Sequence, residues 1–231
     1  MSIKEVFGKF SEIKAVIEKN LFMKTLLVFI FFVLVDSLIY FTVLNVSSMD
    51  DQWFHFKLAY LFRTEGWQVI TNFKWLYFTN LAQHNLSYGF TLYHYFLIPF
   101  TLFPDKIFGL KMVGAIFPAL VYTIYFFVFQ KLNIKNAFFW AVMIFTFSSY
   151  NFAWRMFTGR NFVLINGLLI LEIYLIHKNK YKWLFLIALI HTWWHPATFW
   201  MVPMFVLVYE TMRYINRQKV YYYNLLSGFI G

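Results

Sequence analysis

The sequence predicts an all-α fold: a polytopic transmembrane helical bundle with an interfacial amphipathic helical segment in its first external loop. Two observations lead to this prediction. The 231 residues are 61% hydrophobic and 25% aromatic but only 13% charged, with a mean hydropathy of +0.60, which is more apolar than a soluble domain of this size. The apolar residues also form runs separated by short basic loops, as in helices that cross a bilayer.

The net charge of +10 comes from lysines and arginines that lie mostly in those short loops. In a soluble protein this charge would suggest nucleic acid, whereas here it matches the excess of basic residues in cytoplasmic loops. We therefore expect no nucleic-acid partner and a multi-pass membrane protein with a cytoplasmic N-terminus. The absence of cysteine excludes disulfides and thiolate metal sites.

The first predicted span is the apolar run Leu21–Asn45, which is long enough to cross a bilayer of roughly 30 Å. Asp36 interrupts it. A carboxylate is costly in lipid, so we expect Asp36 to face other helices and to have a structural partner there rather than a catalytic role.

An amphipathic helix is predicted to begin at Asp50 and to lie in the membrane interface. Its apolar side chains recur at spacings of three and four: Trp53, Phe54, Leu58, Leu61 and Phe62. Lys57 and Arg63 fall on its wetter side. Asp51 and His55 are four residues apart on one face and could share a ligand. The alternative is that Asp50 and Asp51 only cap the helix N-terminus.

The following piece, Tyr88–Phe103, is apolar but shorter than the roughly twenty residues of a spanning helix, so we expect it to stay in the outer interface. Five clearer runs follow: Ile107–Gln130, Ala137–Asn151, Phe162–Ile176, Trp183–His191 and Ala197–Tyr209. Pro196 breaks the helix between the last two and biases His195 away from helical angles. A final run begins at Val220, and its end at Gly231 suggests a fragment or a short last helix.

The positive-inside rule then places the basic loops on the side of the N-terminal lysines. The opposite, external side receives a first loop of about residues 46–106, a second of about 154–161 and a third of about 192–196. These three loops are predicted to come together at one external site, which we call the mouth of the bundle.

Motifs in these loops resemble those of one enzyme family. D-Q-W-F-H-F-K at 51–57 is similar to the D-x-W-aromatic-(His or Asn)-x-basic motif in the first external loop of the catalytic subunit of oligosaccharyltransferase, a membrane glycosyltransferase of the C superfamily. R-M-F-T-G-R-N at 155–161 is similar to the family's R-x-x-x-G loop, and W-W-H-P at 193–196 is similar to its tryptophan-rich turn. The stretch G-F-T-L-Y, which begins at Gly89, is similar to another part of the family's first loop. Order and spacing agree over about Leu21–Arg213, so residues 1–231 resemble the N-terminal part of the transmembrane module, without the family's C-terminal soluble domain.

The resemblance implies transfer of a glycan from a polyprenyl phosphate or pyrophosphate carrier to an acceptor, a protein asparagine, at the external face. It implies that Asp51 binds a divalent metal and orients the acceptor. The metal, manganese or magnesium, suits oxygen ligands and would neutralise the departing phosphate. Asp50 and Arg155 would support the catalytic site. The predicted substrate contacts are Trp53, Lys57, Arg160, Asn161, Trp194 and His195.

The sequence lacks the family's acidic pair after the R-x-x-x-G loop, where Arg160 and Asn161 stand instead. Either His55 or Asp50 supplements Asp51 as a metal ligand, or no metal is held. Two alternatives stay open: another C-superfamily glycosyltransferase that acts on lipid or cell-wall glycan, or a catalytically incomplete membrane protein that binds the lipid carrier.

Three further polar residues are expected to have modest roles. His94 is predicted to be interfacial, and His191 to belong to an aromatic belt with Trp193 and Trp194 rather than to a metal site. Glu172 lies inside a span and is expected to partner a buried polar group.

Overall fold

A computed structural model describes residues 20–42, 50–66, 68–71, 91–147, 149–158 and 160–231. Over these ranges every regular element is a helix and there is no strand, so the all-α prediction is confirmed. The helices are α2 (Leu21–Thr42), α3 (Asp50–Glu65), α4 (Gln68–Thr71), α6 (Thr91–Leu97), η2 (Ile98–Leu102), α7 (Lys106–Lys131), α8 (Ala137–Phe147), α9 (Tyr150–Phe157), α10 (Phe162–His177), α11 (Tyr181–Trp194), η3 (Pro196–Thr198), α12 (Met201–Ile215) and α13 (Tyr222–Ile230).

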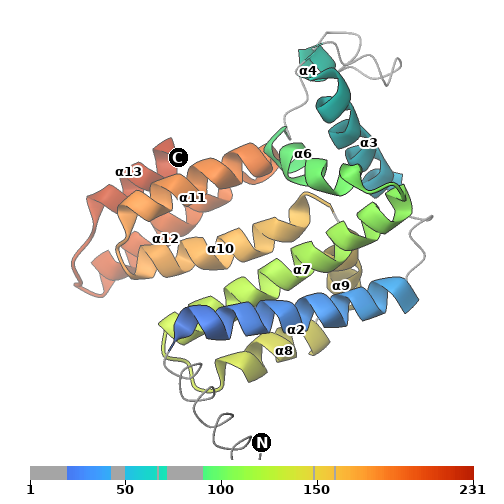
Figure 1. The fold of residues 1–231 in the computed structure, drawn as a ribbon. Coiled ribbons are helices and arrows are strands. Elements are labelled where there is room, and N and C mark those ends of the chain that lie inside the picture. The colour runs from blue at the N-terminus through green and yellow to red at the C-terminus, as the bar shows by residue number, and fades with distance from the viewer. Residues whose placement is uncertain (1–19, 43–49, 67, 72–90, 148, 159) are drawn as a thin grey trace, which may run out of the picture.

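The long helices lie roughly side by side, and the two ends of the bundle differ (Figure 1). The connections α7–α8, α10–α11 and α12–α13 lie together at the left end in Figure 1, whereas α3 and α6 lie at the opposite end, near the end of α11. We call these the basic end and the α3 end. The basic end carries Lys131, Lys135, Lys178, Lys180, Lys182, Arg213, Arg217 and Lys219.

Among the described residues before α7, the apolar stretch 91–102 does not form a spanning helix. This stretch consists of α6, seven residues long, and the 3-10 helix η2, five residues long. Pro99 lies within η2, where its missing N–H and fixed φ limit a regular α-helix. α6 and η2 both contact α3, η2 also contacts α7, and α6 contacts α11. This piece therefore stays at the α3 end.

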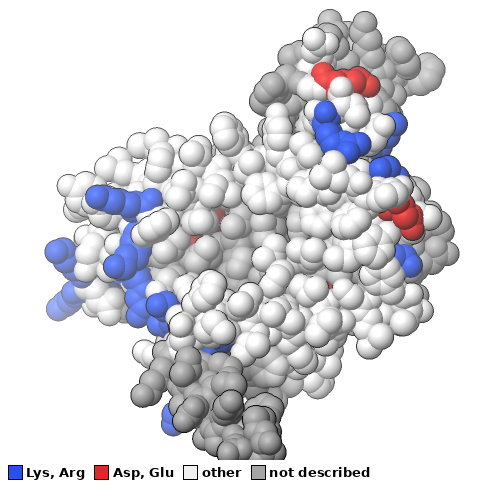
Figure 2. Space-filling model, viewed as in Figure 1, with Lys and Arg blue, Asp and Glu red and all other residues white. Residues whose placement is uncertain are grey.

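Two of the described helices, α2 and α7, are long and apolar enough to cross a membrane. The outward faces of the bundle are also apolar, because large side chains such as Leu34 (65% exposed), Trp183 (62%) and Leu207 (53%) point away from it. Figure 2 shows lysines and arginines at the left end and again around α3, with a nearly uncharged zone between them. Exposed apolar surface of this extent indicates contact with lipid or a partner.

Helix boundaries differ from the predicted ones around the second and third external loops. The predicted run Ala137–Asn151 is two helices, α8 and α9, and α9 continues to Phe157, so Arg155 lies on a helix and not in a loop. Ser149 caps α9 by accepting from the Phe152 N–H. α11 reaches Trp194, which leaves His195 as the first residue outside it, with φ −147° and ψ 81°. The predicted break at this corner is confirmed.

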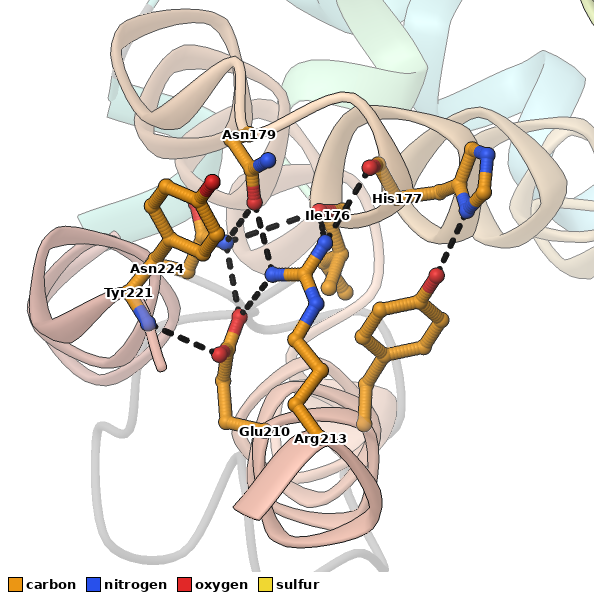
Figure 3. Close-up of polar contacts among 8 residues, drawn as sticks. Ile176, His177, Asn179, Glu210, Arg213, Tyr221 and Asn224 are labelled. Atoms are coloured by element: carbon orange, nitrogen blue, oxygen red, sulfur yellow. Dashed lines mark hydrogen bonds and ion pairs between the residues drawn. The ribbon is translucent and has the colours of Figure 1, made fainter. Parts of the chain in front are cut away.

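A buried polar clasp closes the basic end (Figure 3). Arg213 Nη1 donates to Glu210 Oε1 at 2.7 Å and to Asn179 Oδ1 at 2.6 Å, and its Nη2 donates to the carbonyls of Ile176 and His177 at the end of α10. A guanidinium beside the last carbonyls of a helix satisfies groups that have no partner within the helix. Glu210 also accepts from Asn224 Nδ2 and from the Tyr221 N–H. The clasp therefore joins α10, α12 and α13.

At the core, α2 packs antiparallel against α7 (Figure 1), and the contact between them is the most extensive between any two described helices. Tyr40 of α2 is fully buried, and its ring lies over Gly114 of α7 so closely that a Cβ at Gly114 would overlap it. Asp36, one turn earlier in α2, is also fully buried, as predicted, but neither carboxylate oxygen has a hydrogen-bond partner among the described residues. The expected structural partner of Asp36 is thus not found there.

We expect Gly114→Ala to destabilise the protein, because the added methyl group displaces the Tyr40 ring from a packed interface. Overpacking of this kind costs about 1–3 kcal/mol. Thermal unfolding of the purified chain in detergent measures the effect. Gly167→Ala in α10 is the matched control, since its new Cβ would lie 3.0 Å from the flexible end of Ile124. Equal unfolding temperatures for the two variants would contradict the proposed α2–α7 contact.

Candidate functional site

A pair of buried histidines joins α3 to α6 at the α3 end. His55 Nδ1 lies 3.0 Å from His94 Nε2, and the two residues are 7% and 0% exposed. Two imidazole rings can form this hydrogen bond only if one nitrogen carries a proton and the other does not. His94 had been predicted to be interfacial. That prediction is wrong, because α6 turns inward against α3 and buries the ring.

Tyr93, the neighbour of His94 on α6, links this pair to the tryptophan-rich corner. Its fully buried ring lies edge-on to His55 (centroids 5.1 Å apart) and to Trp194 (5.4 Å). Trp194 is 1% exposed, and its indole N–H donates to the carbonyl of Asn161 at 2.7 Å. Buried indole N–H groups usually need such a partner. The three predicted external loops therefore meet through side chains of α3, α6 and α11.

A cavity of about 240 Å³ lies between α3 and the start of α7, lined by Trp53, Phe56, Lys57, Tyr60 and Lys106. The ammonium groups of Lys57 and Lys106 lie 4.9 Å and 5.8 Å from the centre of the Tyr60 ring. Lys106 is held in place by bonds from Nζ to the carbonyls of Thr101 and Phe103. Two cations above an aromatic floor suit a phosphate joined to an apolar or sugar group.

A third polar cluster connects the bundle interior to the corner at His195. Glu172 Oε1 of α10 lies 2.9 Å from His191 Nδ1 of α11, and both residues are fully buried. His191 Nε2 lies 2.9 Å from the hydroxyl of Thr198, which in turn lies 3.2 Å from His195 Nδ1. Glu172 thus has the buried polar partner expected of it. His191, predicted to lie in an aromatic belt, is instead inside the bundle.

His195 itself is half-buried at the corner between α11 and η3. Burial lowers its pKa below the ordinary value of 6.5, and the neighbouring His191 lowers it further, although a backbone hydrogen bond partly opposes the shift. The imidazole is therefore neutral at pH 7, where its ring has one nitrogen that donates and one that accepts.

The other predicted site residues lie on α3, on α9 and at the start of α10. Position 51 lies one turn before His55 in α3, but only the backbone is described for Asp50 and Asp51. Arg155 and Arg160 are exposed, the first on α9 and the second beside the start of α10. Gly89 lies outside the described residues. The cluster around Tyr93 therefore contains His55, Asn161 and Trp194, while the side chains of the two arginines are exposed.

Metal binding at Asp51 and His55 stays a prediction. Among the side chains that the structure describes, no three His, Cys, Asp or Glu groups gather closely enough to hold a metal ion. His55 and His94 use one ring nitrogen each on the other, and these nitrogens are not the oxygen ligands that magnesium prefers. The carboxylates that could complete a site are those of Asp50 and Asp51.

Sequence reasoning missed three residues of this region: His94, Lys106 and Thr198. His94 and Lys106 follow apolar stretches that carry no signal of the partner they meet. Thr198 comes two residues after Pro196, where a 3-10 turn could have been expected. Only its position beside two histidines makes it part of a polar cluster.

No protein-family model, no curated protein and no solved structure matches this chain.

We expect Trp194→Phe to loosen the junction of the loops. The phenyl ring keeps much of the packing but removes the indole hydrogen bond to the Asn161 carbonyl, at a cost of about 1 kcal/mol, which lowers the unfolding temperature by about 2–4 °C in a chain of this size. Trp193→Phe is the control, because Trp193 is 62% exposed and surface changes rarely exceed about 0.5 kcal/mol. An unfolding temperature for Trp194→Phe equal to that of the control would show that the indole bond contributes nothing.

Proposed function

We propose that this chain is the membrane part of a C-superfamily glycosyltransferase resembling oligosaccharyltransferase, which takes a sugar from a polyprenyl phosphate or pyrophosphate carrier. The observation that carries the proposal is the meeting of three sequence segments that resemble the family. The α3 helix, the carbonyl of Asn161 and the Trp194 corner are far apart in the chain but lie in contact through Tyr93 and His55.

The proposed protein is a multi-pass membrane protein with its N-terminus in the cytoplasm. Support for this comes from the three basic loops at one end of the bundle and from the apolar outward faces between the two ends (Figures 1 and 2). The α3 end then faces the external side. There α3 lies in the interface, with Lys57 and Arg63 exposed and Leu58, Leu61 and Phe62 buried.

The cavity beside α3 supports a phosphate-linked lipid as the donor. Its two lysines can bind a phosphate anion, while Trp53 and Tyr60 offer ring faces to the sugar or to the first isoprene units. Of the predicted substrate residues, Trp53 and Lys57 line this cavity, and Lys106 adds a second cation. The acceptor is a protein asparagine in the leading hypothesis, and a lipid or cell-wall glycan in the alternative.

Transfer itself tests the proposal. In vesicles that contain the full chain, a polyprenyl-phosphate-linked sugar and a peptide with an acceptor asparagine, we expect Asp51→Asn to abolish transfer, because the change removes the charge proposed to bind a metal and orient the acceptor. Asp105→Asn is the matched control. Asp105 caps α7 by accepting from the Ile107 N–H, and asparagine caps about as well as aspartate. Full transfer by Asp51→Asn would overturn the assignment of Asp51.

Donor binding is a separate measurement. We expect Lys57→Gln to weaken binding of the polyprenyl-phosphate-linked sugar by a factor of about 10 to 150, since a charge-assisted bond contributes about 1.5–3 kcal/mol. Lys135→Gln at the basic end should bind as the unchanged chain does. Binding without any transfer would favour the catalytically incomplete lipid-carrier protein. A chain that does not bind the donor at all would refute both.

A further inference from the structure

The hydroxyl of Thr198 lies among three polar atoms, two of them on one residue. Its Oγ1 is 2.9 Å from His191 Nε2, 3.2 Å from His195 Nδ1 and 2.9 Å from the carbonyl oxygen of His195. A hydroxyl has one proton to donate and two lone pairs to accept with. These three contacts use its full capacity.

The carbonyl oxygen decides how the protons are arranged, because it can only accept. The Thr198 proton therefore goes to that carbonyl, and both ring nitrogens must donate to the hydroxyl. His191 then carries a proton on Nε2, and His195 carries one on Nδ1. In any other arrangement, two lone pairs face each other at about 3 Å in a partly buried corner. An acceptor without a hydrogen bond there destabilises the fold, because it has lost its water and gained no partner.

The same accounting extends to Glu172. Because His191 Nε2 is protonated, the hydrogen bond between His191 Nδ1 and Glu172 Oε1 has two possible protonation states. One is an imidazolium that donates to a carboxylate, and the other is a neutral ring that accepts from a carboxylic acid. In both forms one proton lies between the two atoms and the pair is neutral overall. A neutral pair fits the complete burial of both residues and the lack of a described partner for Glu172 Oε2.

We propose that Glu172, His191 and Thr198 form a hydrogen-bonded clamp that fixes His195 as its Nδ1–H tautomer, so that Nε2 is a proton-accepting atom at the α3 end. The clamp holds a ring in place and does not conduct protons, since His191 and His195 both donate to the same hydroxyl. Burial keeps the His195 ring neutral at pH 7 by lowering its pKa, as acceptance at Nε2 requires. Glu172, His191 and Thr198 are thus positioning residues.

The ligand that this arrangement suits carries an O–H or N–H donor, the chemistry of an acceptor hydroxyl or amide. That ligand assignment rests on the proposed glycosyl transfer, whereas the tautomer of His195 does not. Trp194 connects the clamp to the cluster around Tyr93. Its ring packs on Tyr93, and the next residue, His195, begins the turn after α11.

Nitrogen NMR of the full chain, labelled at histidine and held in detergent, tests the tautomer directly. The spectra are recorded at a pH well above the ordinary histidine pKa of about 6.5, and His195→Asn identifies the His195 signals. We expect His195 to show a protonated Nδ1 and an unprotonated Nε2. Thr198→Val removes the hydroxyl with little change of shape, and we expect it to give a mixture of both tautomers.

Two matched variants complete the experiment. Thr192→Val makes the same change at a hydroxyl that bonds only to the Gly231 carbonyl among the described groups, and it should keep the single tautomer. Thr198→Ser keeps the hydroxyl and should also keep the single tautomer of His195. This variant covers the case in which Thr198→Val does not fold. A proton on Nε2 of His195 in the unchanged chain, or the same single tautomer in Thr198→Val, would overturn the clamp.

A transfer assay on the same variants separates this inference from the proposed function. If the tautomer is as expected but no variant transfers sugar, the clamp stands and the glycosyltransferase proposal fails. If the unchanged chain transfers sugar and Thr198→Val lowers kcat with little change in donor KM, both stand. Transfer by an unchanged chain whose His195 carries its proton on Nε2 would refute the clamp alone.

Discussion

A buried polar group in an apolar helix bundle has no water to bond, so a partner on a neighbouring element spares it a large cost in free energy. This constraint organises both ends of the molecule. At the basic end, the Arg213 guanidinium bonds the last carbonyls of α10 while Glu210 holds the start of α13. At the α3 end, the pairs His55–His94 and Glu172–His191 and the Trp194 indole bond play the same part. These contacts fix how the helices are arranged around one mouth.

Close helix packing supports these contacts from the centre of the bundle. Gly114 lets Tyr40 approach the backbone of α7, and the contact between α2 and α7 is the most extensive between any two described helices. The start of α7 in turn supports η2 and α3, so the mouth depends on the α2–α7 pair. The buried polar pairs add contacts of fixed direction to this apolar packing, because a hydrogen bond requires its donor and acceptor in a defined geometry.

Under the proposed function, the cavity beside α3 and the corner at His195 would have different roles. The cavity beside α3 offers lysines and aromatic faces to the donor, whereas the corner at His195 offers a neutral ring held by Thr198. Tyr93 lies between them and touches both His55 and Trp194. Position 51 lies one helical turn from His55 on α3.

The sequence by itself determined the helical class, the apolar faces, the basic loops and the break at Pro196, because these follow from local composition and backbone restriction. Only the tertiary structure decided which polar groups meet. His55 and His94 are 39 residues apart, Trp194 and Asn161 are 33 apart, and His191 and Glu172 are 19 apart. No local pattern marks such pairs, since a histidine that faces lipid headgroups and one that faces a buried carboxylate occupy the same kind of apolar stretch. Packing of helices distant in the chain makes that distinction.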